Sequence, residues 1–260
     1  MDLGLDGRAA FITGGSAGIG LSIARALAAE GVAVGLCARG EKGLADAIES
    51  LAPARAAAFP ADVTDPDALE RSIDAAANQL GRLDFVVANA GGATGGDLVE
   101  STPEDWLDTY KVNVLHAAHA ARVSVPHLEK SDAPAIVLIS SVSGWKPAPR
   151  SSYSTAKAAV IQLAAVLGQE LAPQGIRVNA VSPGSVMFPG SGWQDFQREH
   201  PDRFADFERR QFPRGRLVTA EEVANAVAFL LSPRASGITG ANIAVDAGQN
   251  DPTARRLFPQ

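Results

Sequence analysis

Two side chains in the segment Tyr153-Ser-Thr-Ala-Lys157 could move a proton to or from a carbonyl/alcohol pair. A tyrosine and a lysine four residues apart lie on one face of a helix, with about 5–6 Å between their Cβ atoms. At that spacing we expect the ammonium of Lys157 to lower the pKa of Tyr153 below its usual value of about 10, which suits a general acid or base. Ser141 could hydrogen-bond the same oxygen. The spacing alone is common on helices, so it needs support from the rest of the chain.

A glycine cluster near the N-terminus could hold a pyrophosphate. The apolar run 8–13 is followed by Gly14-Gly-Ser-Ala-Gly18-Ile-Gly20, and a helical pattern begins at Leu21. A strand, a tight turn and a helix N-terminus present backbone N–H groups and the helix dipole to a phosphate. The spacing is G-x-x-x-G-x-G and differs from the usual G-x-G-x-x-G fingerprint. The expected dinucleotide contacts here are Gly14, Ser16, Gly18, Ile19 and Gly20.

With these motifs the chain resembles the short-chain dehydrogenase/reductase family from about Leu5 to Gly248. The matching segments are residues 13–20, Asp62-Val63, Asn89-Ala90-Gly91, Asn113, Ser141, Tyr153 with Lys157, and Pro183-Gly184, in the family's order. The resemblance implies reversible hydride transfer between a nicotinamide dinucleotide and a carbonyl/alcohol substrate. It implies a catalytic set of Asn113, Ser141, Tyr153 and Lys157.

The resemblance also implies cofactor contacts at the ends of several strands. They are Arg39, Asp62, Val63, Asn89, Ala90, Gly91, Tyr153, Lys157, Pro183, Gly184 and Val186. Asp62 would accept a hydrogen bond from the adenine amine. Relatives commonly carry threonine where Phe188 stands, so the bond to the nicotinamide amide must come from backbone such as Val186, or from elsewhere.

Arg39 indicates which dinucleotide binds. Folds that prefer NAD place a carboxylate after the second strand, whereas a 2′-phosphate needs positive charge and no nearby acid. Here Ala38 stands at the position of the acid, and the planar guanidinium of Arg39 suits a phosphate. Ala17 counts against this reading, because many NADP-preferring relatives carry a second basic residue in the glycine loop. We therefore expect NADP(H), with an NAD-dependent alcohol dehydrogenase as the alternative.

Asn113 and the histidines are further candidates, Asn113 for binding a water and the histidines for binding a metal. Asn113 lies in the middle of an expected helix, where asparagine competes with the backbone, and we expect it to hold a relay water next to Lys157. His116 and His119 could share a helix face, but no carboxylate lies at a matching offset to complete a ligand set. We expect no metal site.

Composition agrees with an ordinary globular enzyme. The chain has 260 residues, 46% of them hydrophobic, a net charge of −6 and a single cysteine. The acidic balance argues against nucleic acid as a partner, and one cysteine cannot build a disulfide framework. Cys37 falls in an apolar strand, where we expect a buried hydrophobe. We find neither a signal-peptide pattern nor a long apolar run, so we expect a cytoplasmic protein without membrane contact.

Strands and helices alternate along the chain without a linker, which predicts one α/β domain over residues 1–260. We expect a doubly wound, Rossmann-type, mostly parallel sheet of seven strands with helices on both faces. The expected strands are Arg8–Thr13, Val32–Ala38, Ala56–Pro60, Phe85–Ala88, Ala135–Ser140, Arg177–Ser182 and Asn242–Val245. Expected helix starts are Asp65-Pro66, Thr102-Pro103 and the capping box Thr219–Glu222.

The substrate cannot be named from the sequence; a 3-oxoacyl thioester, a sugar, a steroid or a small ketone would fit. Residues 185–217 are rich in aromatics and are expected to form either a substrate lid or a small local core. Candidate substrate contacts are Trp145, Met187, Phe188 and Trp193. The tail 249–260 could cover a neighbouring subunit's site or lack fixed structure. We expect a homotetramer, since family members pair through the helices of Asn113 and Tyr153. A non-catalytic nicotinamide-sensing regulator is the rival from another class.

Overall fold

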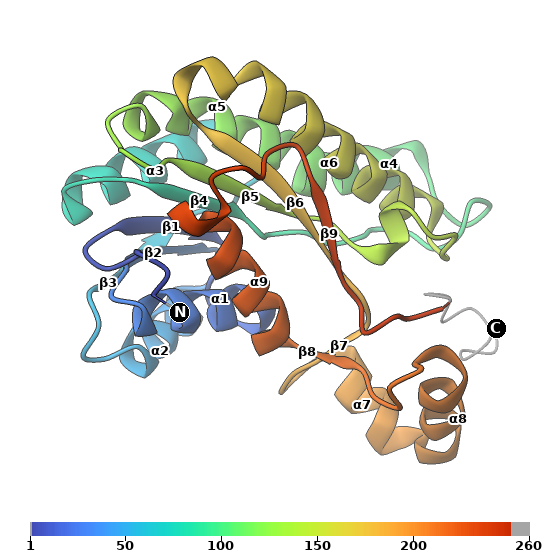
Figure 1. Cartoon of the computed structure of the whole chain (residues 1–260). Coiled ribbons are helices and arrows are strands. Elements are labelled where there is room, and N and C mark those ends of the chain that lie inside the picture. Colours follow the sequence, from blue (N-terminus) through green and yellow to red (C-terminus); the bar gives the residue numbers. More distant parts are fainter. Residues whose placement is uncertain (1, 251–260) are drawn as a thin grey trace.

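A parallel sheet forms the centre of the computed structural model, which describes residues 2–250 (Figure 1). Within that range the sheet has seven strands: β1 (Ala9–Thr13), β2 (Ala33–Ala38), β3 (Ala56–Pro60), β4 (Phe85–Ala88), β5 (Ala135–Ile139), β6 (Arg177–Pro183) and β9 (Asn242–Val245). Their order is β3-β2-β1-β4-β5-β6-β9, and every neighbouring pair is parallel. The order reverses between β1 and β4, where a doubly wound sheet binds its ligand. The expected Rossmann-type sheet is confirmed, with strand bounds that differ by at most one residue.

Helices cover both faces of this sheet (Figure 1). The α-helices described are α1 (Gly18–Ala29), α2 (Glu41–Ser50), α3 (Pro66–Leu80), α4 (Pro103–Tyr110), α5 (His116–Leu128), α6 (Ser151–Glu170), α7 (Gly192–Glu199), α8 (Pro201–Gln211) and α9 (Ala220–Leu231). Short turns of other helix types are η1 (Lys111–Leu115, π), η2 (Val142–Gly144), η3 (Ala172–Gln174) and η4 (Pro233–Ala235). α1, α2 and α9 lie on one face, and α3 to α6 lie on the other.

Each face of the sheet has its own hydrophobic core. Ile23, Leu27 and Val227 belong to the core under α1 and α9, whereas Leu69 and Val160 belong to the core under α3, α5 and α6. Strands buried on both faces read as continuous apolar runs, which is why β1 and β5 stood out in the sequence. Cys37 is fully buried, as expected, and burial raises the pKa of its thiol to about 12.

The expected helix starts are confirmed by their capping bonds. The carboxylate of Asp65 accepts from the N–H of Ala68 at 3.0 Å, so it satisfies a free donor of the first turn of α3. Thr102 and Thr219 form capping boxes at α4 and α9. These caps fix where each helix leaves the carboxyl edge of the sheet.

Residues 185–217 fold into a small unit at that edge. β7 (Val186–Met187) pairs with β8 (Val218–Thr219), and α7 and α8 lie between them (Figure 1). The unit has a core of its own, made of Phe196, Phe204, Phe207, Phe212 and Leu217. Of the two expectations for this region, the local core is therefore what these phenylalanines form.

Among residues 2–250, no helix combines the length and the apolar character needed to cross a bilayer. Most of the predicted tail lies outside the described residues. Gln249, at its start, is fully buried.

Candidate active site

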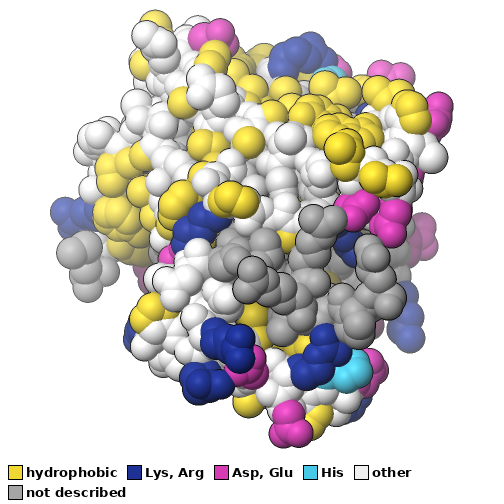
Figure 2. Space-filling model, turned by 90° about the vertical axis from the view of Figure 1, so that its right-hand side faces the viewer, with side chains coloured by type: hydrophobic (Ala, Val, Ile, Leu, Met, Phe, Trp, Pro, Cys, Tyr) yellow, Lys and Arg dark blue, Asp and Glu magenta, His cyan; other side chains and the backbone are white. Residues whose placement is uncertain are grey.

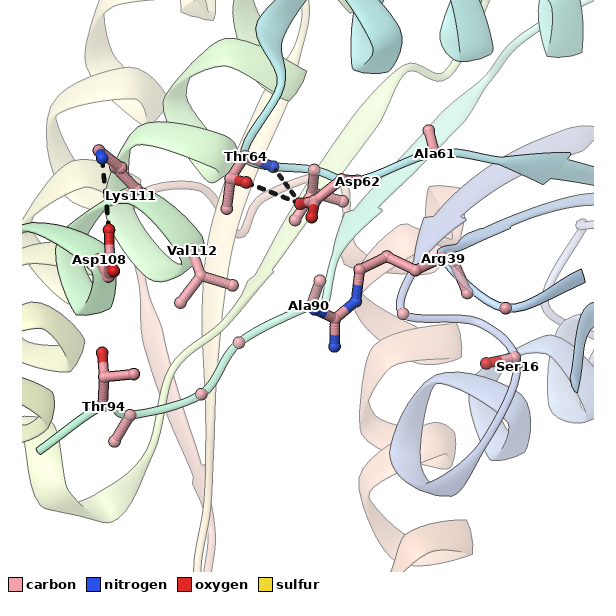
Figure 3. A pocket seen from close by; sticks show the side chains of 17 residues that line it. Ser16, Arg39, Ala61, Asp62, Thr64, Ala90, Thr94, Asp108, Lys111 and Val112 are labelled. Carbon is pink, nitrogen blue, oxygen red and sulfur yellow. Dashed lines mark hydrogen bonds and ion pairs between the residues drawn. The ribbon is translucent and has the colours of Figure 1, made fainter. Parts of the chain in front are cut away.

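A pocket of about 830 Å³ opens at the carboxyl ends of β1 to β4, at the switch point of the strand order. It brings together seven of the residues expected to contact a dinucleotide: Gly14, Ser16, Arg39, Asp62, Val63, Ala90 and Gly91. Figure 3 shows Arg39 reaching from the end of β2 across the pocket toward Ala90. Ala38, noted in the sequence beside Arg39, also lines the pocket. The pocket has further lining residues that the sequence did not single out, namely Gly40, Ala61, Thr64, Gly92, Ala93, Thr94, Asp108, Lys111 and Val112.

Asp62 lies on the rim of this pocket in a fixed orientation. Its Oδ1 accepts from the backbone N–H of Thr64 at 2.9 Å and from the Thr64 hydroxyl at 2.7 Å (Figure 3). These bonds, together with the nearby guanidinium of Arg39, hold the pKa of Asp62 below its usual value. Asp65 caps α3, so Asp62 is not needed for that purpose. The carboxylate is therefore charged and held as an acceptor at the pocket.

The glycine turn fits a dinucleotide. Gly14 has φ +64°, and a Cβ there would lie 2.9 Å from Nδ2 of Asn89, so both the backbone angle and the packing require glycine. The same amide of Asn89 donates to the carbonyls of Thr13 and Gly14 at 3.0 and 3.2 Å. α1 begins without a side-chain cap, which leaves its first N–H groups available to a phosphate. The predicted residues Gly18, Ile19 and Gly20 form this first turn.

Gly91 connects the pocket to the expected catalytic residues. A Cβ added to it would lie 2.7 Å from Oδ1 of Asn113 and 3.0 Å from Nζ of Lys157. A side chain at this position would therefore displace both groups. Because Gly91 lines the pocket, the two polar side chains lie directly behind its wall.

Asn113 lies in the π-helical turn η1 and not in a regular α-helix. Its Nδ2 donates to the carbonyl of Thr109, four residues earlier, at 2.7 Å, and to the carbonyl of Gly92 at 2.6 Å. The side chain thus takes an acceptor that the helix would use, which is the competition expected from the sequence. Isolated π turns of this kind occur frequently at functional sites.

Tyr153 and Lys157 both lie on α6, and the ammonium lies 5.6 Å from the centre of the phenol ring. Lys157 is buried and donates to the carbonyl of Ile139 at 2.9 Å. Burial lowers its pKa from 10.5 to about 8. Ser141 follows β5 and lies close enough to the phenol to lower its pKa by hydrogen bonding. Three of the four expected catalytic residues, Ser141, Tyr153 and Lys157, therefore lie close together.

The expected lowering of the Tyr153 pKa by Lys157 is wrong for this geometry. Removal of the phenol from water raises its pKa above 10, and the opposing influences are the hydrogen bond from Ser141 and the charge of Arg150. Lys157 directs its ammonium to a main-chain carbonyl and not to the phenol oxygen. Tyr153 is consequently a protonated phenol at neutral pH, which is the form of a proton donor.

The remaining predicted cofactor contacts lie at the carboxyl end of β6 and in the segment with β7 that follows it. Pro183 ends β6, Gly184 follows it, and Val186 begins β7 with its side chain in the core. Phe188 covers the glycine turn: a Cβ on Gly18 would lie 3.0 Å from its ring. Such a ring offers apolar contact but no hydrogen bond. The threonine contact of relatives therefore has no side-chain equivalent at this position.

The candidate substrate contacts divide into two groups. Trp145 is 51% exposed at the end of η2, with Lys146 Nζ 4.6 Å from its ring centre. Trp193 instead stacks on Phe207 at 4.7 Å, and Met187 packs against the same small core. Trp193 is thus packed inside the 185–217 unit, and its role as a substrate contact stays a prediction.

Apolar surface lies beside these loops. Leu98 and Val99, in the segment after β4, and Leu107 on α4 are more than half exposed. Figure 2 shows hydrophobic side chains gathered on the upper part of the face that lies at the right of Figure 1, whereas charged side chains of both signs gather on its lower part.

Sequence reasoning missed a buried network behind the pocket. The hydroxyl of Thr13 lies 3.0 Å from Nε2 of His116 and accepts from the N–H groups of Asn89 and Ala90 at 2.9 and 3.1 Å. The other ring nitrogen, Nδ1, lies 2.8 Å from the carbonyl of Val112. The position of Thr13 directly before the glycine cluster was the available signal.

A second missed group connects loops from three strands. Lys146 Nζ forms an ion pair with Asp246 at 2.7 Å and also donates to the carbonyl of Gln249. The side chain of Gln249 bonds the N–H and hydroxyl of Ser185 at 2.8 and 3.1 Å. These contacts join the segments after β5, β6 and β9, and no spacing in the sequence indicates them.

The histidine pair of α5 has other partners than a metal. His119 Nε2 contacts the carbonyl of Pro66 at 2.9 Å, on the side of α3. In the part of the chain that the structure describes, no three histidine, cysteine, aspartate or glutamate side chains are grouped as metal ligands.

Comparison with known proteins identifies the family. Residues 14–250 match the sequence model of the enoyl-(acyl carrier protein) reductase family. Isoepoxydon dehydrogenase patN of Penicillium expansum is 34% identical over 252 residues, which cover 94% of this chain and 95% of that protein. The crystal structure of L-sorbose reductase from Gluconobacter frateurii, complexed with NADPH and L-sorbose, has a TM-score of 0.88 at 29% identity and covers 96% of this chain and 98% of that one. A variant of a Serratia marcescens short-chain dehydrogenase/reductase has a TM-score of 0.84 at 30% identity, covering 94% and 98% of the two chains. The glycine turn, the pocket at the switch point and the Tyr153/Lys157 pair fit these relatives, and the chain is an NAD(P)-dependent oxidoreductase acting on CH–OH groups that belongs to the short-chain dehydrogenase/reductase family.

Proposed function

We propose that the chain catalyses reversible hydride transfer between NADP(H) and a ketone/secondary-alcohol pair. The observation that carries the proposal is the position of Gly91: it lines the dinucleotide pocket, and a Cβ added to it would come within 3.0 Å of both Asn113 and Lys157. The cofactor pocket and the proton-transfer groups thus share one wall. In reduction, the carbonyl carbon gains a hydride and the carbonyl oxygen gains a proton, so the product is the alcohol.

Each of the four polar side chains has one proposed task. The nicotinamide ring of the bound cofactor supplies or accepts the hydride. Tyr153 donates its proton to the oxygen of the substrate, and Ser141 donates a hydrogen bond to the same oxygen. Lys157, positively charged below pH about 8, contacts the cofactor ribose. Asn113, whose amide donates to the carbonyl of Thr109 in the π turn, positions the water that returns the proton to Tyr153.

The first test replaces the proton donor. Tyr153→Phe keeps the ring and removes the hydroxyl, so kcat should fall by roughly a hundredfold to ten-thousandfold while dinucleotide affinity changes little. Turnover would be measured with a panel of ketones and alcohols in both directions, and affinity by cofactor fluorescence. Tyr110→Phe is the matched control, because Tyr110 is the other tyrosine of the chain and stacks on Trp106 in α4. Near-normal turnover by Tyr153→Phe would exclude this mechanism.

The preference for NADP(H) is proposed from the charges at the end of β2. Arg39 extends into the pocket, and Ala38 leaves no carboxylate on that strand to repel a 2′-phosphate (Figure 3). Among the described residues, Arg39 has no hydrogen-bond or ion-pair partner. The pKa of Asp62 is lowered chiefly by its hydrogen bonds from Thr64, and the charge of Arg39 adds to this effect. A guanidinium that is free to turn toward a phosphate can bind it with two parallel hydrogen bonds.

The second test measures kcat/KM for both dinucleotides. A charge-assisted contact contributes roughly 1.5–3 kcal/mol, or a factor of about ten to a hundred and fifty. Arg39→Ala should weaken NADPH by about that factor and leave NADH nearly unchanged. Ala38→Asp should go further, because its carboxylate repels the phosphate and accepts from the ribose hydroxyls of NAD. A wild-type preference for NADH, or equal losses with both cofactors, would remove the NADP proposal and leave the alternative of an NAD enzyme.

A further inference from the structure

Arg150 lies at the start of the helix that carries Tyr153, three residues before it. It is the N-cap residue of α6, with φ +64° and ψ 82°. A non-glycine residue in this left-handed region is uncommon and has to be held there by its surroundings. Its carbonyl accepts from the N–H of Ser154 at 3.0 Å, and the Ser154 hydroxyl contacts the carbonyls of Ala148 and Pro149. The backbone that carries Arg150 is therefore tied to the catalytic helix.

The charge of Arg150 acts at the reacting phenol. Its guanidinium is the one cation whose charge counteracts the rise in the Tyr153 pKa, so it lies within electrostatic range of that oxygen. Lys157 is buried behind the site and bonded to Ile139. Lys146 is paired with Asp246. Both lysines are therefore engaged with groups of the protein itself.

No group within residues 2–250 neutralises Arg150. Its side chain is exposed and has no hydrogen bond or ion pair in that range, and the first turn of α6 contains no acidic residue. Arg150 does not line the dinucleotide pocket; the arginine that lines it is Arg39. A chain with a net charge of −6 thus exposes an uncompensated cation three residues before Tyr153, at the start of the same helix.

We propose that Arg150 binds an anionic group of the substrate, so that the enzyme acts on carbonyl compounds bearing a carboxylate and on the matching hydroxy acids. The inference rests on the proposed function above, because it places the carboxylate relative to the carbonyl that Tyr153 protonates. A planar guanidinium binds a carboxylate with two parallel hydrogen bonds and would fix the distance between the two groups of the substrate. The left-handed backbone would keep that distance the same from one turnover to the next.

The experiment compares keto acids with their neutral amides, which carry the same carbonyl. Levulinate with levulinamide, and acetoacetate with acetoacetamide, would be reduced by the wild type, by Arg150→Asn and by Arg150→Lys. Asparagine tolerates the left-handed backbone, so this variant removes the charge with little strain. Arg71→Gln is the matched control, because Arg71 is exposed on α3 and its loss changes the net charge equally.

We expect the wild type to prefer each keto acid over its amide in kcat/KM by about tenfold, since an exposed charge is partly screened by solvent and salt. Arg150→Asn should abolish the preference through a higher KM for the acid, Arg150→Lys should restore part of it, and Arg71→Gln should retain it. The preference should shrink as ionic strength rises. The hydroxy acid formed by reduction of levulinate should also raise the Tm of the wild type more than the Tm of Arg150→Asn. This measurement tests binding without turnover.

Two outcomes would overturn the inference. The first is that the wild type reduces acids and amides equally well, or that Arg150→Asn slows the reduction of both alike. Either result would show that Arg150 does not bind the anionic group of the substrate, and the proposed function would stand. If no carbonyl in this panel or in the broader ketone panel is turned over, the proposed function fails and the inference fails with it.

Discussion

The imidazole of His116 is held in its neutral form by its two partners. The carbonyl of Val112 can only accept, so Nδ1 carries the proton, and Nε2 accepts from the hydroxyl of Thr13. That hydroxyl already accepts from two backbone N–H groups, so a second imidazole proton would have no acceptor. Burial, together with the charge of Lys157, lowers the pKa of His116 from 6.5 to about 4.

This depressed pKa predicts acid sensitivity. Between pH 6.5 and about 4 the unfolded chain binds a proton that the folded chain resists, so the free energy of unfolding falls as the pH falls through that range. A shift of this size corresponds to about 3 kcal/mol. Urea unfolding at a series of pH values should show a flatter dependence for His116→Gln than for the wild type.

His119→Gln is the matched control, because His119 lies one helical turn along α5 and its ring bonds a carbonyl at the protein surface. It should leave the pH dependence as steep as in the wild type. An unchanged slope in His116→Gln would show that the imidazole titrates alike in the folded and unfolded chain.

Residues bonded within their own segment were the ones that the sequence predicted well. Asp65, Thr102 and Thr219 cap their helices as expected, because a cap needs only a polar side chain and the backbone three residues on. The partners of Tyr153 were predicted only in part. The direction of the Lys157 ammonium depends on the carbonyl of Ile139 in β5, a contact that no local spacing encodes.

At the scale of elements, the strands were predictable and the connections between their loops were not. Buried parallel strands are continuous apolar runs, so the five inner strands could be located from composition and their flanking turns. The two edge strands, β3 and β9, have alternating exposure and were located from their short apolar segments between turns. The two-residue strands β7 and β8 are too short to show any periodicity. Their paired residues Val186 and Val218 lie 32 positions apart in the sequence.

The ion pair between Lys146 and Asp246 allows a prediction about how these elements are held together. Both side chains are largely buried, at 16% and 11% exposure, so the loss of one leaves the other charge poorly solvated. Lys146→Met should lower the free energy of unfolding by about 1–3 kcal/mol, less than for a fully buried pair. It should also raise KM for substrate more than KM for dinucleotide, because Lys146 adjoins Trp145 and not the dinucleotide pocket.

A double-mutant cycle with Asp246→Asn separates the pair from other effects. Asparagine can still accept from the N–H of Gly248, which Asp246 contacts at 2.9 Å. If the pair connects the loops, the double variant should be more stable than the sum of the single losses predicts. Additive losses would mean that each residue acts independently.

At the scale of the whole molecule, α6 has an inner and an outer side. Ala156, Val160 and Ala164 are fully buried against the sheet, whereas Ala158 and Val166 lie on the exposed side. Ile161 and Leu163 are partly exposed as well, so apolar side chains also lie on the outer side of the helix, beside the polar Gln162. A helix with two apolar sides is normally covered on both. We therefore propose that this surface pairs with a second copy of the chain and that the assembly is a homotetramer.

Ala158→Glu tests this proposal, because two copies of the variant would bring carboxylates together at an interface where the charge cannot be solvated. Light scattering at micromolar concentration should show a tetramer for the wild type and smaller species for the variant. Circular dichroism should show the same helix content, since position 158 already faces outward in the single chain. Ala29→Glu is the control: Ala29 is also an exposed alanine, at the end of α1 on the opposite side of the sheet, and its substitution should leave the tetramer intact. A wild type that scatters as a monomer would rule out the assembly, and dissociation by both variants would place the interface elsewhere.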